Sequence, residues 1–160
     1  MTSTQQQAPA PALPIGQAVG QAEATLTKLL GMALADRSIS RRVYLALQRL
    51  NALGDQATRT VYEQDLTEWL ELGPAAAAGL ADELIQAGLA AASGGDGGIR
   101  LTSQGQALRA DILADGRRLT GPVLATIDPA DLQTTIRTLT EITTGLRGIA
   151  VRPAAKEATA

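Results

Sequence analysis

Apolar residues recur at steps of three and four along most of the chain, which is the spacing of amphipathic helices. The stretches with this spacing cover residues 16–36, 39–53, 62–72, 75–88, 103–127 and 129–149. Turn-forming residues separate them, namely Gly54, Gly73-Pro74 and Asp128-Pro129. Proline is favoured at the first position of a helix and aspartate at its cap. The spacing therefore predicts a mainly α-helical chain.

One region departs from the helical spacing. LAAAS at 89–93 and IRLT at 99–102 flank the tip GGDGG at 94–98, which predicts a β-hairpin. A short extended piece is predicted at 59–61. The fold class is thus mainly α, with a helix-turn-helix at about 62–88, a small β-hairpin wing at about 89–102, and long helices on either side that form a helical dimerisation region.

Aromatic residues make up only 2% of the chain: Tyr44, Tyr62 and Trp69, with no phenylalanine. The core must therefore be built from aliphatic side chains. Trp69 lies beside Leu66 and Leu70 in the helical pattern, and we predict that it points inward.

The chain of 160 residues contains no cysteine and no histidine. This removes thiol chemistry, the commonest general base and the commonest transition-metal ligand. We expect no enzyme activity and no cofactor. The carboxylates of residues 62–72 are expected to form a solvated acidic face rather than a metal site.

The two ends of the chain differ in composition from the rest. Residues 1–15 and 151–160 are expected to be disordered tails around one domain at 16–150. The first residues have neither the basic nor the apolar segment of a signal peptide, and no apolar run approaches the length of a membrane span. We therefore expect a cytoplasmic protein without a membrane partner.

The last predicted helix has apolar residues seven apart, a pattern that favours a partner helix. The candidate dimer-interface residues are Leu132, Ile136, Leu139 and Leu146. Packing within a single subunit would give the same pattern and stays open as the alternative.

Charge is distributed unevenly over the helix-turn-helix. No lysine or arginine lies between Arg59 and Arg100, whereas this stretch holds seven acids. The whole chain has a net charge of −2 and a pI of about 5.1. Since most DNA affinity comes from basic side chains that meet phosphates, this charge opposes what the motif indicates.

The order of elements resembles the MarR family of winged-helix transcription factors over about residues 16–150. The resemblance rests on Leu66, Trp69 and Leu70, the turn Leu72-Gly73-Pro74, the recognition helix around Leu80 to Leu84, and the phrase LTSQGQAL at 101–108. It implies a homodimer, formed through the first and last two helices, that binds operator DNA. It also implies a small-molecule effector between the dimer helices and the DNA-binding lobes.

The sequence departs from the family at the positions that would touch DNA. Where the family has Ser, Thr and Arg, this chain has Ala75, Ala76, Ala78 and Gly79, and its wing tip holds an acid instead of arginines. The remaining DNA-contact candidates are the backbone at Pro74 and the side chains of Arg41, Arg42, Arg59 and Arg100. The alternative is a winged-helix interaction protein that has lost DNA contact.

Overall fold

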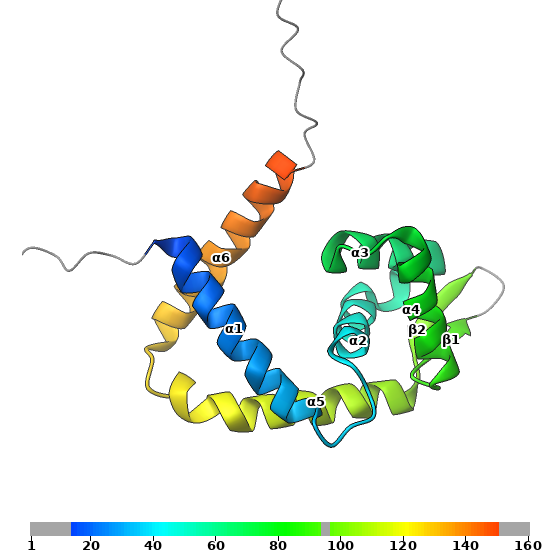
Figure 1. Ribbon diagram of the computed structural model, residues 1–160, viewed down its shortest axis with the longest axis horizontal. Coiled ribbons are helices and arrows are strands. Elements are labelled where there is room, and N and C mark those ends of the chain that lie inside the picture. Colours follow the sequence, from blue (N-terminus) through cyan, green and yellow to red (C-terminus); the bar gives the residue numbers. More distant parts are fainter. Residues whose placement is uncertain (1–13, 94–96, 151–160) are drawn as a thin grey trace, which may run out of the picture. The chain divides into compact units, whose positions relative to one another are not determined.

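The computed structural model describes residues 14–93 and 97–150 (Figure 1). The tails predicted at 1–15 and 151–160 lie outside these residues, apart from Pro14 and Ile15. The chain divides into two compact units, one ending at Leu119 and the other beginning at Thr120.

The first unit holds the winged helix and the helix that precedes it. Its elements are α1 (Ile15–Leu34), α2 (Arg41–Leu53), the 3-10 turn η1 (Gly54–Gln56), α3 (Arg59–Leu70), α4 (Pro74–Gln86), β1 (Ala90–Ser93), β2 (Gly98–Leu101) and most of α5 (Ser103–Leu124). Ser40 caps α2 by accepting a hydrogen bond from the Val43 amide, and Gly54 follows the helix with a φ of 57°. Gly54 therefore ends the helix where the sequence predicts.

The wing is an antiparallel hairpin whose pairing runs from Ala90↔Leu101 to Ser93↔Gly98. Its base is tied to the start of α3, because the Ile99 amide donates to the Ala57 carbonyl over 2.8 Å and Thr58 forms a bridge with Gly98. The tip, residues 94–96, lies outside the described residues.

The wing passes into α5 through a close backbone approach. A Cβ atom placed on Gly105 would lie 2.1 Å from the Leu89 carbonyl oxygen, so only glycine fits there. The Thr102 hydroxyl donates to the Gly88 carbonyl over 2.6 Å and accepts from the Gly105 amide. Thr102 and Gly105 of the phrase at 101–108 therefore hold the end of the wing against the start of α5.

The core of the winged helix is aliphatic except for one tyrosine, as the composition predicts. Tyr62 and Leu66 of α3 are fully buried and pack with apolar residues of α2, α4 and the hairpin. The Tyr62 hydroxyl donates to the Ala46 carbonyl over 2.8 Å. A second, smaller cluster joins the end of α1 to α2 and α5 through Leu34, Tyr44 and Ile112.

Two predictions about α3 are wrong. The extended piece at 59–61 is instead the first turn of the helix, because Thr58 accepts a hydrogen bond from the Val61 amide and caps it. Trp69 does not point inward, since 42% of its surface is exposed. The buried line of α3 follows steps of four from Tyr62 to Leu66, which leaves Trp69 at the edge.

The second unit contains the end of α5 and the helix α6 (Pro129–Ala150). Helix α5 continues past Pro122 and ends at Leu124. The Asp128 carboxylate accepts a hydrogen bond from the Ala130 amide over 2.7 Å, which confirms the predicted cap.

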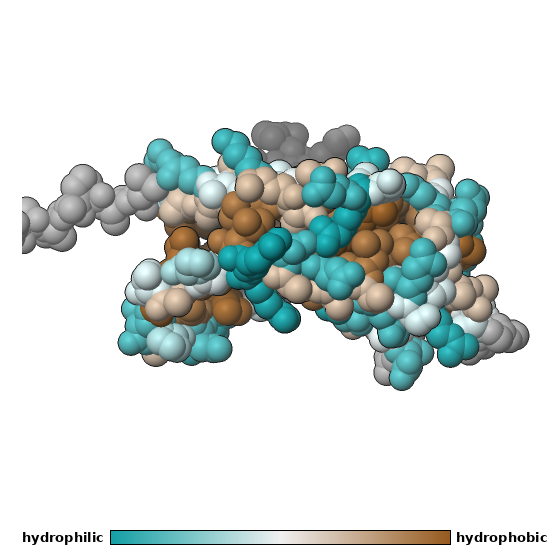
Figure 2. Space-filling view, turned by 90° about the horizontal axis from the view of Figure 1, so that it is seen from below, coloured by the Kyte–Doolittle hydropathy of each residue, from teal (hydrophilic) through white to brown (hydrophobic). Residues whose placement is uncertain are grey.

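Many apolar side chains are exposed in the isolated chain. On α6, Ile136, Leu139 and Leu146 are 60%, 39% and 60% exposed, while Leu132 is half-buried. Figure 2 shows one face of the molecule, on which hydrophobic side chains in brown lie among hydrophilic ones in teal. Among the described residues, none of the helices has the length and apolarity that crossing a bilayer requires.

Candidate nucleic-acid interface and pocket

The first turns of α4 present small side chains and backbone. Gly73 precedes the helix and Pro74 opens it. Ala75, Ala76 and Gly79 are exposed, Ala78 is half-buried, and Ala77 is fully buried against the core. A Cβ atom on Gly79 would meet no atom within 4 Å. The first amides of a helix have no intrahelical acceptor, so this end can hold an anion through its backbone.

Arg59 connects the start of α3 to α4. Its guanidinium forms ion pairs of 2.6 Å with Glu63 and 2.7 Å with Asp82, and it donates to the Ala78 carbonyl over 3.4 Å. The hydrogen bond from Arg59 holds the pKa of the Asp82 carboxyl below its usual value. In the same way Asp82 and Glu63 raise the pKa of Arg59. The guanidinium of Arg59 is thus already paired with two carboxylates.

Arg49 neutralises a third acid of the helix-turn-helix. It donates two hydrogen bonds, of 2.8 Å and 2.6 Å, to the two oxygens of Asp65. The exposed acids of this region that form no ion pair among the described residues are Glu68, Glu71 and Glu83. Arg49 and Arg59 therefore neutralise part of the negative charge that the sequence places on α3 and α4. Among the described residues, no three acidic side chains lie close enough together to hold a metal ion.

Arg100 is exposed on β2. The strand alternates, so that Ile99 is buried in the core and Arg100 points to the other face. In the described part of the chain it forms no ion pair. It is therefore a positive charge at the wing that is available to a partner.

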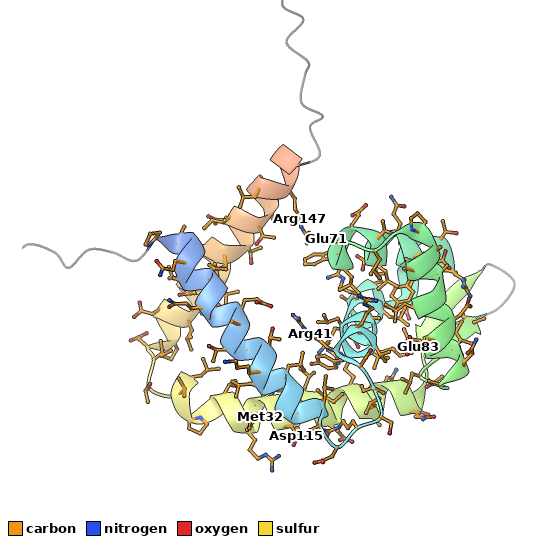
Figure 3. All side chains as sticks on the ribbon, in the orientation of Figure 1. Met32, Arg41, Glu71, Glu83, Asp115 and Arg147 are labelled. Carbon is orange, nitrogen blue, oxygen red and sulfur yellow. The ribbon has the colours of Figure 1, made fainter. Side chains whose placement is uncertain are left out.

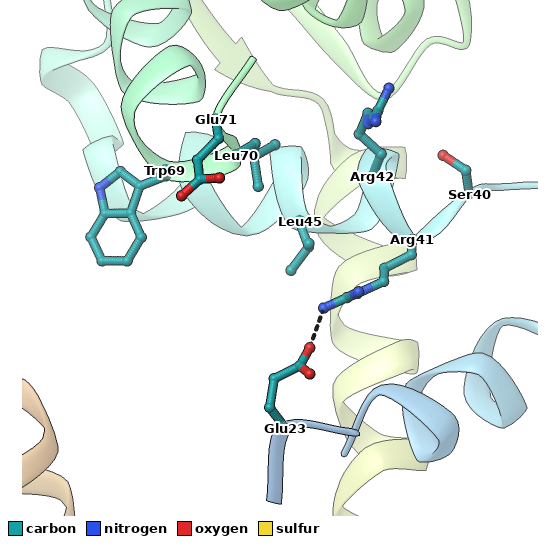
Figure 4. Close-up of a pocket in the computed structure, with 8 residues that line it drawn as sticks. All are labelled: Glu23, Ser40, Arg41, Arg42, Leu45, Trp69, Leu70 and Glu71. Atoms are coloured by element: carbon teal, nitrogen blue, oxygen red, sulfur yellow. Dashed lines mark hydrogen bonds and ion pairs between the residues drawn. The ribbon is translucent and has the colours of Figure 1, made fainter. Parts of the chain in front are cut away.

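Arg41 and Arg42 lie in the first turn of α2 and line an open pocket with a volume of about 700 Å³ (Figure 4). The full lining is Glu23, Ser40, Arg41, Arg42, Leu45, Trp69, Leu70 and Glu71. Arg41 reaches from α2 toward α1 (Figure 3) and forms an ion pair of 3.2 Å with Glu23. The side chains of this pair are 50% and 61% exposed.

The predicted DNA-contact residues fall into separate places. Arg59 and Ala78 meet at the start of α3, whereas Arg41 and Arg42 share the pocket with the end of α3. The 12 residues of α3 span roughly 18 Å at 1.5 Å per residue. Sequence reasoning missed Arg49 and the pocket residues Glu23, Leu45 and Glu71. They come from three helices that only the fold brings together, and no local motif marks them.

The chain has the fold of MarR-type winged-helix proteins, in agreement with the resemblance seen in the sequence. A MarR family protein from Bacillus stearothermophilus is 20% identical, with a TM-score of 0.67 over 83% of this chain and 93% of that one. CouR from Rhodococcus jostii RHA1, solved with p-coumaroyl-CoA, is 21% identical, with a TM-score of 0.66 over 83% and 95%. A Mycobacterium tuberculosis MarR family protein, solved with DNA, is 20% identical, with a TM-score of 0.61 over 82% and 98%. No protein-family model and no curated protein matches the sequence.

Proposed function

We propose that this chain is a dimeric DNA-binding transcriptional regulator that responds to a small molecule. The observation that carries the proposal is the helix-turn-helix with a wing, in which the first turns of α4 are exposed and Arg100 on β2 forms no ion pair with any described residue. Similar folds have been solved with DNA and with p-coumaroyl-CoA. Such a regulator has no enzymatic step and acts in the cytoplasm.

The proposed contact with DNA relies on backbone and shape more than on side chains. Ala75 and Ala76 offer methyl groups, which can contact a thymine methyl but cannot form a hydrogen bond with a base. The free amides at the start of α4 and the guanidinium of Arg100 would meet phosphates, which positions the protein without reading sequence. We therefore expect weak sequence discrimination and modest affinity.

The proposed dimer interface includes apolar residues of α6, namely the exposed Ile136, Leu139 and Leu146 and the half-buried Leu132. A monomer would leave them in water, and soluble proteins seldom expose large apolar patches. Two winged helices in one dimer would engage successive major grooves about 34–36 Å apart. A small molecule that changes the spacing of the two lobes would then change DNA affinity.

A second function is favoured by the charge of the same surface. Glu68, Glu71 and Glu83 are exposed, and they would repel a polyanion. The competing proposal is that the fold is kept while the acidic helix-turn-helix contacts a protein. This proposal needs no basic surface between the two recognition helices.

DNA binding by the full chain to genomic fragments, measured over a range of salt concentrations, separates the two proposals. Arg42 and Arg100 are the candidate arginines without an ion pair in the described residues, and a dimer carries four such side chains. A regulator should therefore bind at low salt, with a salt slope no steeper than about −4. Complete absence of binding at low salt would favour the interaction protein.

A further inference from the structure

One face of the recognition helix α4 is open to solvent from its first turn to its last. Leu80, Ala81 and Leu84 are buried against the core, so the opposite face is the one that a DNA groove can reach. Its exposed residues are Ala75, Ala76, Gly79, Asp82, Glu83 and Gln86. They recur mainly at steps of three and four, which is the spacing at which a helix in the major groove presents side chains to base edges.

The chemistry of this face changes along the helix. The first two turns offer only small residues, and a Cβ atom placed on Gly79 would meet no atom within 4 Å. Such a surface lets the backbone approach DNA closely, but it cannot form a side-chain hydrogen bond with a base. The only polar side chains of α4 come later, at Asp82, Glu83 and Gln86. A hydrogen bond from an α4 side chain to a base must therefore come from one of these three.

Glu83 is the best placed of the three. Asp82 already forms an ion pair of 2.7 Å with Arg59. Gln86 is the last residue of α4, whereas a recognition helix contacts bases with its N-terminal part. Glu83 lies one turn after Gly79 (Figure 3), and its exposed carboxylate forms no ion pair or hydrogen bond with any described residue. It is therefore available to a base edge.

A carboxylate distinguishes bases because it only accepts hydrogen bonds. In the major groove guanine presents two acceptors and thymine presents the acceptor O4, and a carboxylate is repelled by both bases. Adenine presents a donor beside the acceptor N7, whereas cytosine presents the donor amino group N4 alone. Cytosine is thus the base whose edge fits the Glu83 carboxylate best.

We propose that Glu83 is the specificity-determining residue of α4 and accepts a hydrogen bond from a cytosine amino group in each half of the operator. The inference rests on the proposed DNA binding and adds to it the base that is read. The negative charge of Glu83 weakens binding to every sequence, and a cytosine offsets this cost. The discrimination therefore comes mainly from the rejection of guanine and thymine, and it is confined to one base pair per half-site.

The test starts with the full-length protein and the Glu83→Ala variant, each used at low salt to select bound duplexes from a random DNA library. The position at which the two selections differ is the one that Glu83 reads. Four labelled duplexes with cytosine, adenine, guanine or thymine at this position are then titrated, and fluorescence anisotropy gives each dissociation constant. We expect the parent protein to prefer cytosine over guanine and thymine by about tenfold.

Three substitutions separate base reading from simple repulsion. Glu83→Ala should tighten binding to the guanine and thymine duplexes and remove the preference for cytosine. Glu83→Gln should move the preference toward adenine, because glutamine both donates and accepts. Glu68→Ala is the matched control, since it removes an exposed acid of α3 and should change the affinity for all four duplexes by one common factor. Thermal unfolding of each variant checks that it is folded.

Two results would overturn the inference while DNA binding stands. One is a Glu83→Ala variant that binds all four duplexes more tightly by the same factor, because Glu83 would then be only a solvated charge. The other is a parent protein whose selected sequences share no cytosine. If the parent protein binds no DNA at low salt, the inference and the regulator proposal fail together, and the interaction-protein proposal gains.

Discussion

The guanidinium carbon of Arg49 lies 3.9 Å from the centre of the Trp69 ring. Arg49 is held in place by its two hydrogen bonds to Asp65, so one side chain from α2 covers the indole and neutralises an acid of α3. This contact explains how a large aromatic ring is kept at the edge of the core rather than inside it.

The first prediction concerns the stability that Trp69 contributes. A fully buried tryptophan would cost about 3–5 kcal/mol on truncation to alanine. Because Trp69 is 42% exposed, we expect Trp69→Ala to cost only about 1–2 kcal/mol, from partial burial and the cation–π contact. Equilibrium denaturation measures this, with Leu66→Ala as the buried comparison at about 2–5 kcal/mol. Equal losses in the two variants would mean that Trp69 is in the core.

The second prediction compares two glycines. Gly105→Ala places a Cβ atom against the Leu89 carbonyl, whereas the same change at Gly79 meets open space inside α4. We expect Gly105→Ala to lose at least about 2–3 kcal/mol, because the junction of wing and helix must shift. Gly79→Ala should gain up to about 1 kcal/mol from helix propensity. Thermal denaturation of both variants measures these changes in stability. If Gly105→Ala is as stable as the parent protein, the close approach of Gly105 to Leu89 is contradicted.

The sequence predicted the fold well because the determining signals are local. The spacing of apolar residues, the cap at Asp128, the turn at Gly54 and the Gly73-Pro74 junction each report on neighbouring residues. The site was predicted less well, because it depends on contacts between distant segments. The capture of Arg59 by Asp82 and the pocket between α1, α2 and α3 are such contacts. The error at Trp69 has the same origin, since a helical pattern does not show which of two adjacent apolar residues faces the core.

The third prediction concerns alkaline pH. Burial raises the pKa of the Tyr62 hydroxyl well above its ordinary value of 10.0. A raised pKa in the folded state means that the stability linked to this group is complete below about pH 10 and is lost as the pH rises further. Tyr62→Phe should cost about 1 kcal/mol near neutral pH, from the lost hydrogen bond to Ala46. The variant should also lose less stability than the parent between about pH 9 and pH 11. Parallel unfolding curves for the two proteins over this range would show that Tyr62 does not titrate as proposed.

The fourth prediction is the oligomeric state. Sedimentation equilibrium at micromolar concentration should give about twice the chain mass of 16.5 kDa, because the apolar residues of α6 are exposed in one chain. Leu139→Glu places a charge on that surface and should shift the protein toward the monomer. Thr140→Glu, at the next residue, is a control for helix and charge effects. A monomeric parent protein would remove the basis for a two-lobed DNA reader.

The last prediction separates a free arginine from a paired one. Arg100 is exposed without an ion pair among the described residues, and Arg59 is held by Glu63 and Asp82. We expect Arg100→Ala to weaken binding to all DNA sequences alike and to leave thermal stability unchanged. Each dimer loses two phosphate contacts, so the salt slope should become shallower by about 2. Arg59→Ala should instead lower the melting temperature, because two acids lose their partner near α4. A loss of sequence preference on replacing Arg100 would show that this side chain reads a base rather than a phosphate.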